Sequence, residues 1–509
     1  MSFVLYDVET TGLNKRFDQI VQFAAVHTDS DLNVRDRIEI CCRLMPHVIP
    51  SPQAMQVTGL RIGQLLDPSL PSHYEMVTEV RHKLESWCPS MFLGFNSLSF
   101  DEEFLRQAFY LSLYNPYLTN SSGNARADVL NLCRMTAALR PNALKPATDH
   151  DGRKKFRLNQ LAEANGIAAP TSHRAMADVT TTLALCQLIK DNAPEIWSQF
   201  LKFSQKRSVE SFVTDEDAFV VSETVGNDHR ARVVTLIGKH AEQPTKHYCL
   251  DIGTDLDTLQ DMSDGDLVNL CRSSARPIVT IRTNAAPTLW ELHEVDTAHL
   301  APFEDQAKVL NRVERLREDK NFLERLRHAA QSAEPDFPPS LHLEDQIYGH
   351  TFPSRDDERL MHEFRASSWE KRAVLARQFN DSRYCRIALR IIYLERPDLL
   401  APESQAAIEN AIQARLMAAP DADVPWRSIL KAKRDLGALL QSDLQRKEMA
   451  ILTRYSDHLE KREEEISRSL VINRSCTSGS LRLTMPSSRL IAGGCRESRT
   501  TARMTSVPR

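Results

Sequence analysis

The sequence predicts an α/β domain with a mixed sheet, followed by a β-rich domain and then an all-α C-terminal domain. Three observations predict this order. Short runs of alternating apolar residues open the chain, helix-like and strand-like stretches then alternate, and apolar residues recur at helical spacing from Asp356 onward. A chain of 509 residues is also long for a single hydrophobic core, so several domains are expected.

The first domain is expected over residues 1–198. Its opening runs alternate apolar and polar residues between turn-forming stretches such as TTGLN, which is typical of a meandering sheet. Later stretches repeat apolar residues at the helical period, and Gly166 closes one of them. The predicted strands cover residues 3–9, 20–26, 37–44 and 91–95, and the predicted helices cover residues 74–87, 100–113, 127–139, 158–165 and 175–191.

Three further regions follow the first domain. Residues 199–352 predict a small β-rich domain from strand-like runs at 231–238, 247–253 and 277–283. Residues 353–470 carry apolar residues at helical spacing and predict a helical domain. Residues 471–509 contain seven arginines, one carboxylate and no lysine among many Ser, Thr and Gly residues, which predicts a disordered tail. Its charge leaves two interpretations open, a DNA-binding arm and an extension without function.

The composition argues against several classes of protein. No run of about 18 apolar residues is present, and the N-terminus lacks the layout of a secretion signal. The ten cysteines include no C-x-x-C pair, which favours buried thiols over zinc or redox sites. A formal net charge of −4 argues against a basic coat that grips nucleic acid by charge alone. We therefore expect a cytoplasmic protein with no membrane partner.

Two acidic residues stand side by side in the first predicted strand. In the string DVETTG, Asp7 and Glu9 project from the same face of the strand, while Val8 faces the core. Two such carboxylates repel each other unless a cation lies between them. The pair therefore predicts a site for a hard divalent metal such as Mg²⁺, with an exposed polar strand edge as the alternative.

Three more polar residues lie where helices are expected to begin. Asp101, in the string GFNSLSFD, falls in the first turn of a predicted helix, where the helix dipole favours a carboxylate. In the string SHRAMAD, His173 lies at the start of another helix and Asp178 lies about one turn further along. Taken singly, each of these residues also suits an ordinary helix start.

The combination of these residues predicts the chemistry. Four carboxylates can hold two Mg²⁺ ions about 4 Å apart, which stabilise the attacking and leaving oxygens of a phosphoryl displacement. A histidine with a pKa near neutrality supplies the general base for the attacking water. We therefore expect Asp7, Glu9, Asp101 and Asp178 to bind metal in a catalytic site whose general base is His173.

These motifs resemble those of the DEDDh 3′–5′ exonucleases. DVETTG, NSLSFD and HRAMAD match the three motifs of that family, and Arg174 stands where a sister group carries a tyrosine. The strings FDEEFLRQAFY, YNPY, FRLNQLAEANGI and HRAMADVTTTLA further resemble bacterial exonuclease I enzymes, and this likeness covers residues 1–470. The resemblance implies an RNase H-like exonuclease domain, an SH3-like β-rich domain and an all-α C-terminal domain.

The resemblance also implies a function. It implies processive degradation of single-stranded DNA from the 3′ end to 5′-mononucleotides, in DNA repair and recombination, with two Mg²⁺ ions as cofactor and Mn²⁺ as a substitute. Substrate contacts are implied for Glu9 and for four residues outside the motifs, namely Arg157, Arg106, Tyr117 and Arg134. Cations and aromatic rings suit phosphates and stacked bases, although a solvated cation or a core ring is the alternative at each of the four.

The resemblance also implies a protein partner, and the sequence departs from the family in two places. The implied partner is the acidic C-terminal tail of single-stranded DNA-binding protein, and a monomer fits a shape that encloses one strand. Residues 118–127 lack the Trp that exonuclease I carries in that stretch, and the Arg-rich tail has no recognised counterpart. Two other functions stay open, a DEDDh exoribonuclease and a non-catalytic single-stranded DNA-binding scaffold.

Overall fold

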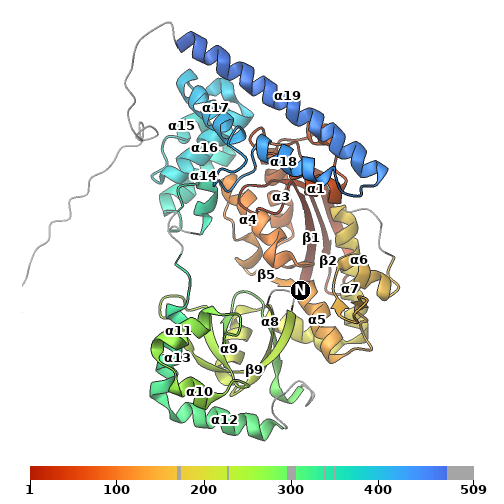
Figure 1. Cartoon of the computed structure of the whole chain (residues 1–509), viewed down its shortest axis with the longest axis vertical. Helices are drawn as coiled ribbons and strands as arrows, with labels where there is room; N and C mark the ends of the chain where they lie inside the picture. Colours follow the sequence, from red (N-terminus) through yellow and green to blue (C-terminus); the bar gives the residue numbers. More distant parts are fainter. Residues whose placement is uncertain (169–173, 226–227, 295–304, 337–339, 349–350, 478–509) are drawn as a thin grey trace, which may run out of the picture.

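The structure is a computed structural model. It describes residues 1–168, 174–225, 228–294, 305–336, 340–348 and 351–477. Two five-stranded sheets and a group of C-terminal helices make up most of the fold. Figure 1 shows the first sheet near the centre, the second sheet and its helices below it, and the C-terminal helices above it.

The first sheet is mixed, as the sequence predicts. Its strand order is β3-β2-β1-β4-β5, in which β1 runs antiparallel to β2 and parallel to β4. β2 is antiparallel to β3, and β4 is parallel to β5. The strands are β1 (Ser2–Thr10), β2 (Ile20–Thr28), β3 (Val34–Cys41), β4 (Ser90–Gly94) and β5 (Ala125–Asp128).

Helices cover both faces of this sheet, so the central strand β1 is buried on both sides. Phe3 and Leu5 contribute to one hydrophobic core, and Val4, Tyr6 and Val8 contribute to the other. The first face carries α5 (Val129–Leu139), α7 (Ala175–Asn192) and α8 (Pro194–Phe203), and the second carries α3 (His73–Ser86) and α4 (Asp101–Leu111). The other elements of this region are α1 (Pro52–Thr58), α2 (Ile62–Leu65), α6 (Leu158–Ala164), β6 (Ala147–Thr148) and β7 (Lys154–Lys155).

The second sheet is antiparallel and has the strand order β11-β10-β9-β8-β12. Its strands are β8 (Phe219–Val225), β9 (Asp228–Lys239), β10 (Lys246–Asp251), β11 (Ile278–Arg282) and β12 (Thr288–Glu291). The sequence predicts three of these strands. Helices accompany the sheet, namely α9 (Lys206–Asp215), α10 (Leu256–Asp261), α11 (Asp264–Arg272), α12 (Gln306–Glu318) and α13 (Lys320–Ser332).

The C-terminal region is helical, as predicted. Its helices are α14 (Arg355–Ala366), α15 (Trp369–Leu375), α16 (Ser382–Glu395), α17 (Pro402–Leu416), α18 (Ile429–Leu439) and α19 (Arg446–Thr477). α19 packs against α1 and α18 and runs along the top of the molecule in Figure 1. It extends through residues 471–477, where the sequence suggested a disordered tail, and residues 478–509 lie outside the described residues.

The predicted bounds are wrong for two elements, one at its start and one at both ends. The helix expected over residues 127–139 begins at Val129, because Ala127 and Asp128 end strand β5 and the Asp128 side chain accepts the Leu130 N–H as an N-cap. The strand expected over residues 37–44 is β3, which begins at Val34 and ends at Cys41. Apolar periodicity locates an element well but leaves its ends open, because caps depend on single side chains.

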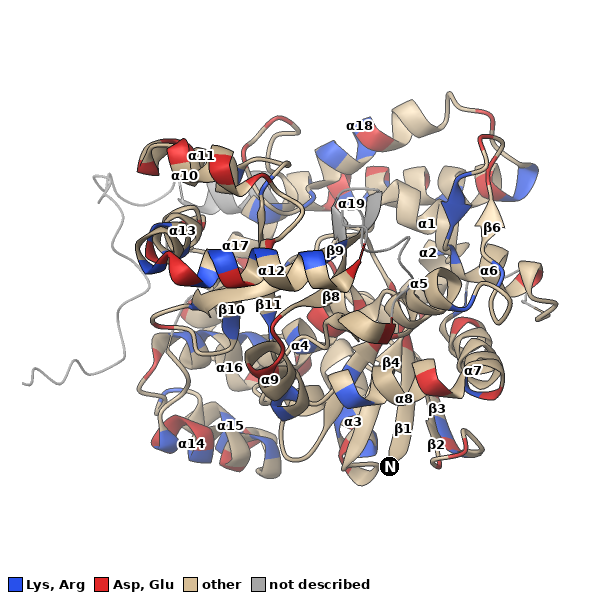
Figure 2. Ribbon diagram, turned by 90° about the horizontal axis from the view of Figure 1, so that it is seen from below, with Lys and Arg blue, Asp and Glu red and all other residues tan. Residues whose placement is uncertain are grey.

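Acidic and basic residues alternate along the outer helices. Figure 2 shows both charges on α12 and on α14, which agrees with a formal net charge of −4 over the whole chain. Within the part of the chain that the structure describes, no helix is both long enough and apolar enough to cross a membrane.

The close approach of β4 to β1 makes Gly94 a test of this packing. An Ala side chain there would place its Cβ 2.5 Å from the Ser97 Cβ and 2.9 Å from the Tyr6 carbonyl oxygen. We expect Gly94→Ala to lower the free energy of unfolding by about 1–3 kcal/mol, measured by urea denaturation. The matched control is Gly437→Ala inside α18, where a Cβ meets nothing within 4 Å. The control should gain about 0.5–1 kcal/mol, and equal midpoints for the two variants would contradict this packing.

Candidate metal centre

Three carboxylates meet near the C-terminal end of β1. Asp7 and Glu9 follow Phe3 and Leu5 on the strand face that α7 covers, because side chains alternate along a strand. Asp178 reaches the same place from the first turn of α7. One oxygen from each of the three carboxylates lies within 4.8 Å of the other two. The three side chains are therefore close enough to share a cation.

Asp101 stands next to this cluster. It is the first residue of α4, and its Oδ1 accepts a hydrogen bond from the Val8 N–H at 3.0 Å. Val8 lies between Asp7 and Glu9 in β1, so this hydrogen bond fixes α4 to the strand segment that carries them. The charge of Asp101 also raises the pKa of Asp7, which places the two carboxyl groups in electrostatic contact.

Burial and repulsion between these groups oppose their ionisation. Burial raises the pKa of Asp7, and the charges of Asp101, Glu9 and Asp178 raise it further. Burial and then the charge of Asp178 raise the pKa of Glu9 to about 7, and burial raises the pKa of Asp101 to about 8. A cation held between the oxygens would remove this cost. Carboxylate oxygens are ligands that hard divalent ions prefer, so the residues present fit such an ion.

Asp128 is a buried carboxylate that the sequence analysis missed. Its Oδ1 accepts the Asn96 N–H at 2.8 Å, and its Oδ2 accepts the Leu98 N–H at 3.2 Å. Asn96 has a φ of 61°, a left-handed conformation that a non-glycine residue adopts only when its surroundings hold it there. Asp128 thus fixes the turn that leads from β4 into Asp101. The sequence signal that could have identified Asp128 is an acidic residue between a strand and a helix.

Arg106 belongs to a buried ionic network. Its guanidinium pairs with Glu102 at 2.9 Å and donates to the Tyr348 hydroxyl at 3.2 Å. Glu102 also pairs with Arg126 at 2.7 Å and accepts from the Tyr6 hydroxyl at 2.8 Å. Burial acts to raise the pKa of Glu102, but the charges of Arg126 and Arg106 bring it below its ordinary value. The network ties α4 to β1 and to the chain near Tyr348, and a DNA contact by Arg106 stays a prediction.

Tyr117 and Arg134 lie in partly buried surroundings. The Tyr117 ring packs against Phe352 with centroids 5.9 Å apart, and the Arg106 guanidinium lies 5.1 Å from the Tyr117 ring centroid. The Phe352 side chain itself is 78% exposed. The Arg134 guanidinium lies 6.0 Å from the centroid of Phe156. Their contacts with DNA stay predictions.

Arg157 and His173 complete the predicted set. Arg157 is exposed just before α6, where it lines a hollow of about 630 Å³ together with Lys155, Gln160 and Glu163. A basic side chain at an open hollow suits a phosphate contact, which stays a prediction. His173 lies outside the described residues, and α7 begins two residues after it at Ala175.

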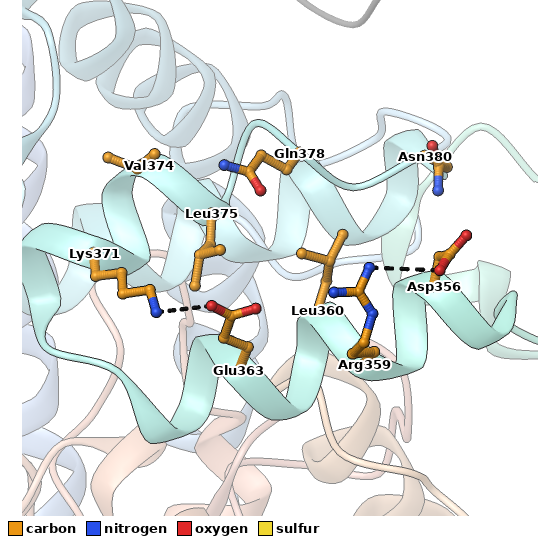
Figure 3. Close-up of a pocket in the computed structure, with 9 residues that line it drawn as sticks. All are labelled: Asp356, Arg359, Leu360, Glu363, Lys371, Val374, Leu375, Gln378 and Asn380. Atoms are coloured by element: carbon orange, nitrogen blue, oxygen red, sulfur yellow. Dashed lines mark hydrogen bonds and ion pairs between the residues drawn. The ribbon is translucent and has the colours of Figure 1, made fainter.

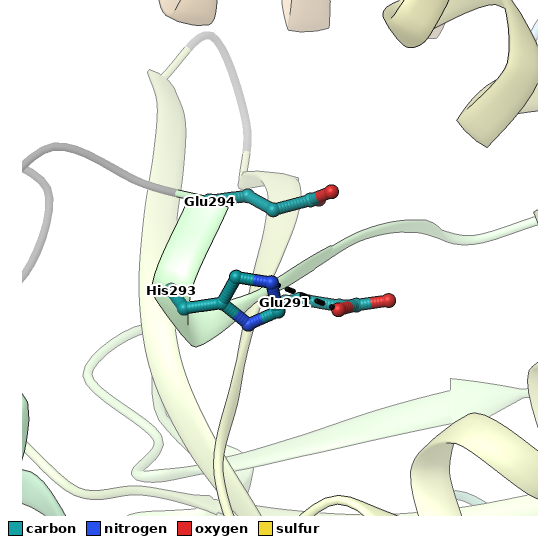
Figure 4. Close-up of side chains that lie close together, drawn as sticks. All are labelled: Glu291, His293 and Glu294. Carbon is teal, nitrogen blue, oxygen red and sulfur yellow. Dashed lines mark ion pairs between the residues drawn. The ribbon is translucent and has the colours of Figure 1, made fainter.

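A second group of metal-ligating side chains lies in the region of the second sheet. One ligand atom each from Glu291, His293 and Glu294 falls within 4.8 Å of the other two, and Figure 4 shows these side chains close together. Their polar atoms already have protein partners. Glu291 pairs with Lys202 at 3.1 Å and with His293 at 3.3 Å, and Glu294 accepts from Gln199 at 2.7 Å. The β1 cluster, in which burial and repulsion raise carboxyl pKa values, is therefore the better candidate for a metal centre.

A hollow of about 410 Å³ lies between α14 and α15, away from the β1 carboxylates. Figure 3 shows its charged side chains in pairs, and Lys371 contacts Glu363 at 2.8 Å while Arg359 contacts Asp356 at 3.5 Å. Because these charges neutralise each other, this hollow offers less for an anionic or cationic ligand than the carboxylate cluster.

Two sequence families match this chain. The family described as Exonuclease matches residues 4–186, and the Exonuclease I C-terminal domain matches residues 342–462. Exodeoxyribonuclease I of Haemophilus influenzae is 34% identical over 275 residues, which is 52% of this chain and 57% of that protein. Exodeoxyribonuclease I of Escherichia coli is 27% identical over 373 residues, which is 70% of this chain and 77% of that protein. The match thus spans little more than half of the Haemophilus protein.

Solved structures of similar proteins share the fold. Escherichia coli exonuclease I in complex with a dA16 oligonucleotide superposes with a TM-score of 0.81 at 23% identity, over 91% of this chain and 99% of that chain. Exonuclease I from Methylocaldum szegediense superposes with a TM-score of 0.80 at 24% identity, over the same shares of the two chains. The RNase H-like mixed sheet and the helical C-terminal region expected from the sequence are confirmed.

The raised carboxyl pKa values predict a pH-dependent response to metal. Between its ordinary pKa of 4.5 and its folded pKa of about 7, Glu9 keeps its proton in the folded protein and loses it in the unfolded chain. The metal-free fold therefore loses stability as the pH rises through this window. A divalent ion must displace these protons, and displacing one proton changes its apparent affinity about tenfold per pH unit.

We therefore expect Mg²⁺ to raise Tm more at about pH 8.5 than at about pH 6, as measured by differential scanning fluorimetry. The Glu294→Gln variant should keep the full pH-dependent response, because its change lies in the other cluster. The Asp7→Asn, Glu9→Gln double variant should lose it. A Tm shift of the same size at both pH values in the wild type would count against metal binding by these carboxylates.

Proposed function

We propose that this chain, which matches the Exonuclease family and the Exonuclease I C-terminal domain, is a 3′–5′ exonuclease that degrades single-stranded DNA processively to 5′-mononucleotides. The observation that carries this proposal is the close approach of Asp7, Glu9 and Asp178. Asp7 and Glu9 come from one motif that resembles the DEDDh exonucleases, and Asp178 comes from another. The two motifs are separated by most of the first domain. Hydrolysis of a phosphodiester by metal catalysis requires divalent ions, which these carboxylates would bind.

The proposed mechanism uses two Mg²⁺ ions, for which Mn²⁺ substitutes. When bound, the ions supply positive charge that stabilises the attacking and leaving oxygens. Asp7, Glu9 and Asp178 would hold them, and Asp101 would join from the start of α4, where Val8 already orients its carboxylate. His173 would take the proton from the attacking water as the general base. Arg157 would hold the phosphate backbone of the strand.

The substrate and partner follow from relatives. Solved structures contain Escherichia coli exonuclease I with dA16 and dT13 oligonucleotides, and one contains SSB/exonuclease I with an inhibitor. We propose single-stranded DNA as the substrate of this chain and the acidic tail of single-stranded DNA-binding protein as its partner. A monomeric state, a cytoplasmic location and a role in DNA repair and recombination belong to the same proposal.

A gel time course tests the substrate and the polarity. With Mg²⁺ we expect 5′-labelled single-stranded DNA to be converted to short end products with few intermediate lengths, because degradation is processive, and we expect no digestion with EDTA. Duplex DNA and RNA of the same sequence should resist. Digestion of RNA at the rate of DNA would favour an exoribonuclease, and binding of single-stranded DNA without digestion would favour a scaffold.

Substitutions test the roles of individual residues. We expect His173→Ala to lower kcat by about 10²- to 10⁴-fold, because the attacking water loses its base, and Asp7→Asn to lower it at least as far. Both variants should bind a labelled oligonucleotide with near wild-type affinity, measured by fluorescence anisotropy. Glu294→Gln, in the cluster of Figure 4, is the control and should keep wild-type kcat. Wild-type turnover by His173→Ala would remove its assignment as the base.

A further inference from the structure

The turn that follows the metal-binding strand is held by the C-terminal helical region. We call residues 11–18, between β1 and β2, the active-site turn, and residues 425–427, between α17 and α18, the brace. Asn14 donates from its side-chain amide to the Pro425 carbonyl oxygen at 2.7 Å. The Arg427 guanidinium lies 3.7 Å from Asp18 Oδ1. The two segments are more than 400 residues apart in sequence and contact each other through both charge and hydrogen bonding.

Apolar packing adds a third contact. Phe17, which is only 7% exposed, lies 5.9 Å from the Trp426 ring and 6.0 Å from the His342 ring. The Arg415 guanidinium stands 5.3 Å from the Phe17 ring centroid, and its Nη1 pairs with Glu344 at 3.0 Å. Phe17 therefore belongs to the active-site turn, but its side chain is buried among residues from the C-terminal part of the chain. Such a ring anchors the turn more firmly than a surface ion pair alone.

Asp18 connects these contacts to the start of the turn through hydrogen bonds. Its Oδ1 accepts the Thr11 hydroxyl at 3.0 Å, and its Oδ2 accepts the Asn14 N–H at 2.9 Å. The Thr11 hydroxyl in turn accepts the Gln19 N–H at 2.9 Å. A Cβ at Gly12 would run into the Asp18 carboxylate, so the turn and this side chain are tightly fitted.

Thr11 lies two residues beyond Glu9, and the pairing of β1 with β2 shifts register between Glu9 and Thr10. The direction of the Glu9 carboxylate at such a bulge depends on the backbone that follows it. Contacts thus lead from Arg427 through Asp18 to Thr11, and the backbone continues from Thr11 to Glu9 of the metal centre.

We propose that the brace positions the active-site turn for catalysis, with Phe17, Asp18 and Arg427 as positioning residues. This inference rests on the proposed exonuclease function and goes beyond it, because it gives the helical region a task at the metal centre itself. Without the brace, the turn keeps its own hydrogen bonds but loses its outer support. Glu9 then samples directions in which it does not share a cation with Asp7 and Asp178, and turnover falls while binding of the strand elsewhere persists.

The test uses the full-length chain and single-stranded DNA with Mg²⁺. We expect Arg427→Gln and Phe17→Leu each to lower kcat by about 10- to 100-fold with KM for DNA changed less than about threefold. The Mg²⁺ concentration for half-maximal kcat should rise in both variants. Arg427→Lys keeps the charge and should recover part of the loss. Arg359→Gln, on α14 and 68% exposed, is the matched control and should behave as the wild type.

Three results would count against this proposal or the function on which it rests. Wild-type kcat and Mg²⁺ dependence in both Arg427→Gln and Phe17→Leu would overturn the brace. A fall in Tm with unchanged kcat would assign these residues to stability alone and would overturn it as well. A wild-type protein that digests no single-stranded DNA would defeat the proposed function, which is measured first, independently of any variant.

Discussion

The repulsion among closely spaced carboxylates is the constraint on which the rest of the site depends. Asp7, Glu9 and Asp178 have oxygens within 4.8 Å of one another, and the pKa of Glu9 rises to about 7. A fold keeps such a group only if its backbone is held against the repulsion, because the side chains would otherwise move apart. The central position of β1, covered by helices on both faces, supplies that support.

The polar residues around the three carboxylates have different effects on the site. Asp101 accepts the Val8 N–H and so fixes α4 to β1, and Asp128 accepts the Asn96 N–H and so fixes the turn after β4. Glu102 neutralises two arginines inside the fold. The environment separates the pKa values of Asp101 and Glu102, since the first rises to about 8 and the second falls below its ordinary value. These adjacent carboxylates on one helix therefore have opposite electrostatic roles. Glu102 balances charge within the fold, and Asp101 adds to the repulsion that a metal ion would relieve.

Strong local patterns made much of this arrangement predictable from the sequence. The alternation in residues 3–9 placed Asp7 and Glu9 on one face, and the helix starts placed Asp101 and Asp178 in the first turns of α4 and α7. The position of Asp128 between a strand and a helix signals only an N-cap, whereas its hydrogen bonds to the N–H groups of Asn96 and Leu98 depend on the tertiary fold and could not be predicted. The helices α12 and α13 were missed because the strand-like runs at 231–238, 247–253 and 277–283 set the prediction for the whole region, although both helices carry apolar residues at helical spacing.

Contacts across the chain explain why the downstream regions pack so closely against the first domain. Arg106 joins α4 to Tyr348, and Tyr455 of α19 donates to the Pro50 carbonyl oxygen at 2.6 Å. Both contacts lie beside segments that lead into or away from the metal centre, and neither depends on a bound strand. The helical region is therefore packed as part of the support for the site. A region that served only to hold DNA would not need to bury residues such as Tyr455 and Phe17 where the two regions meet.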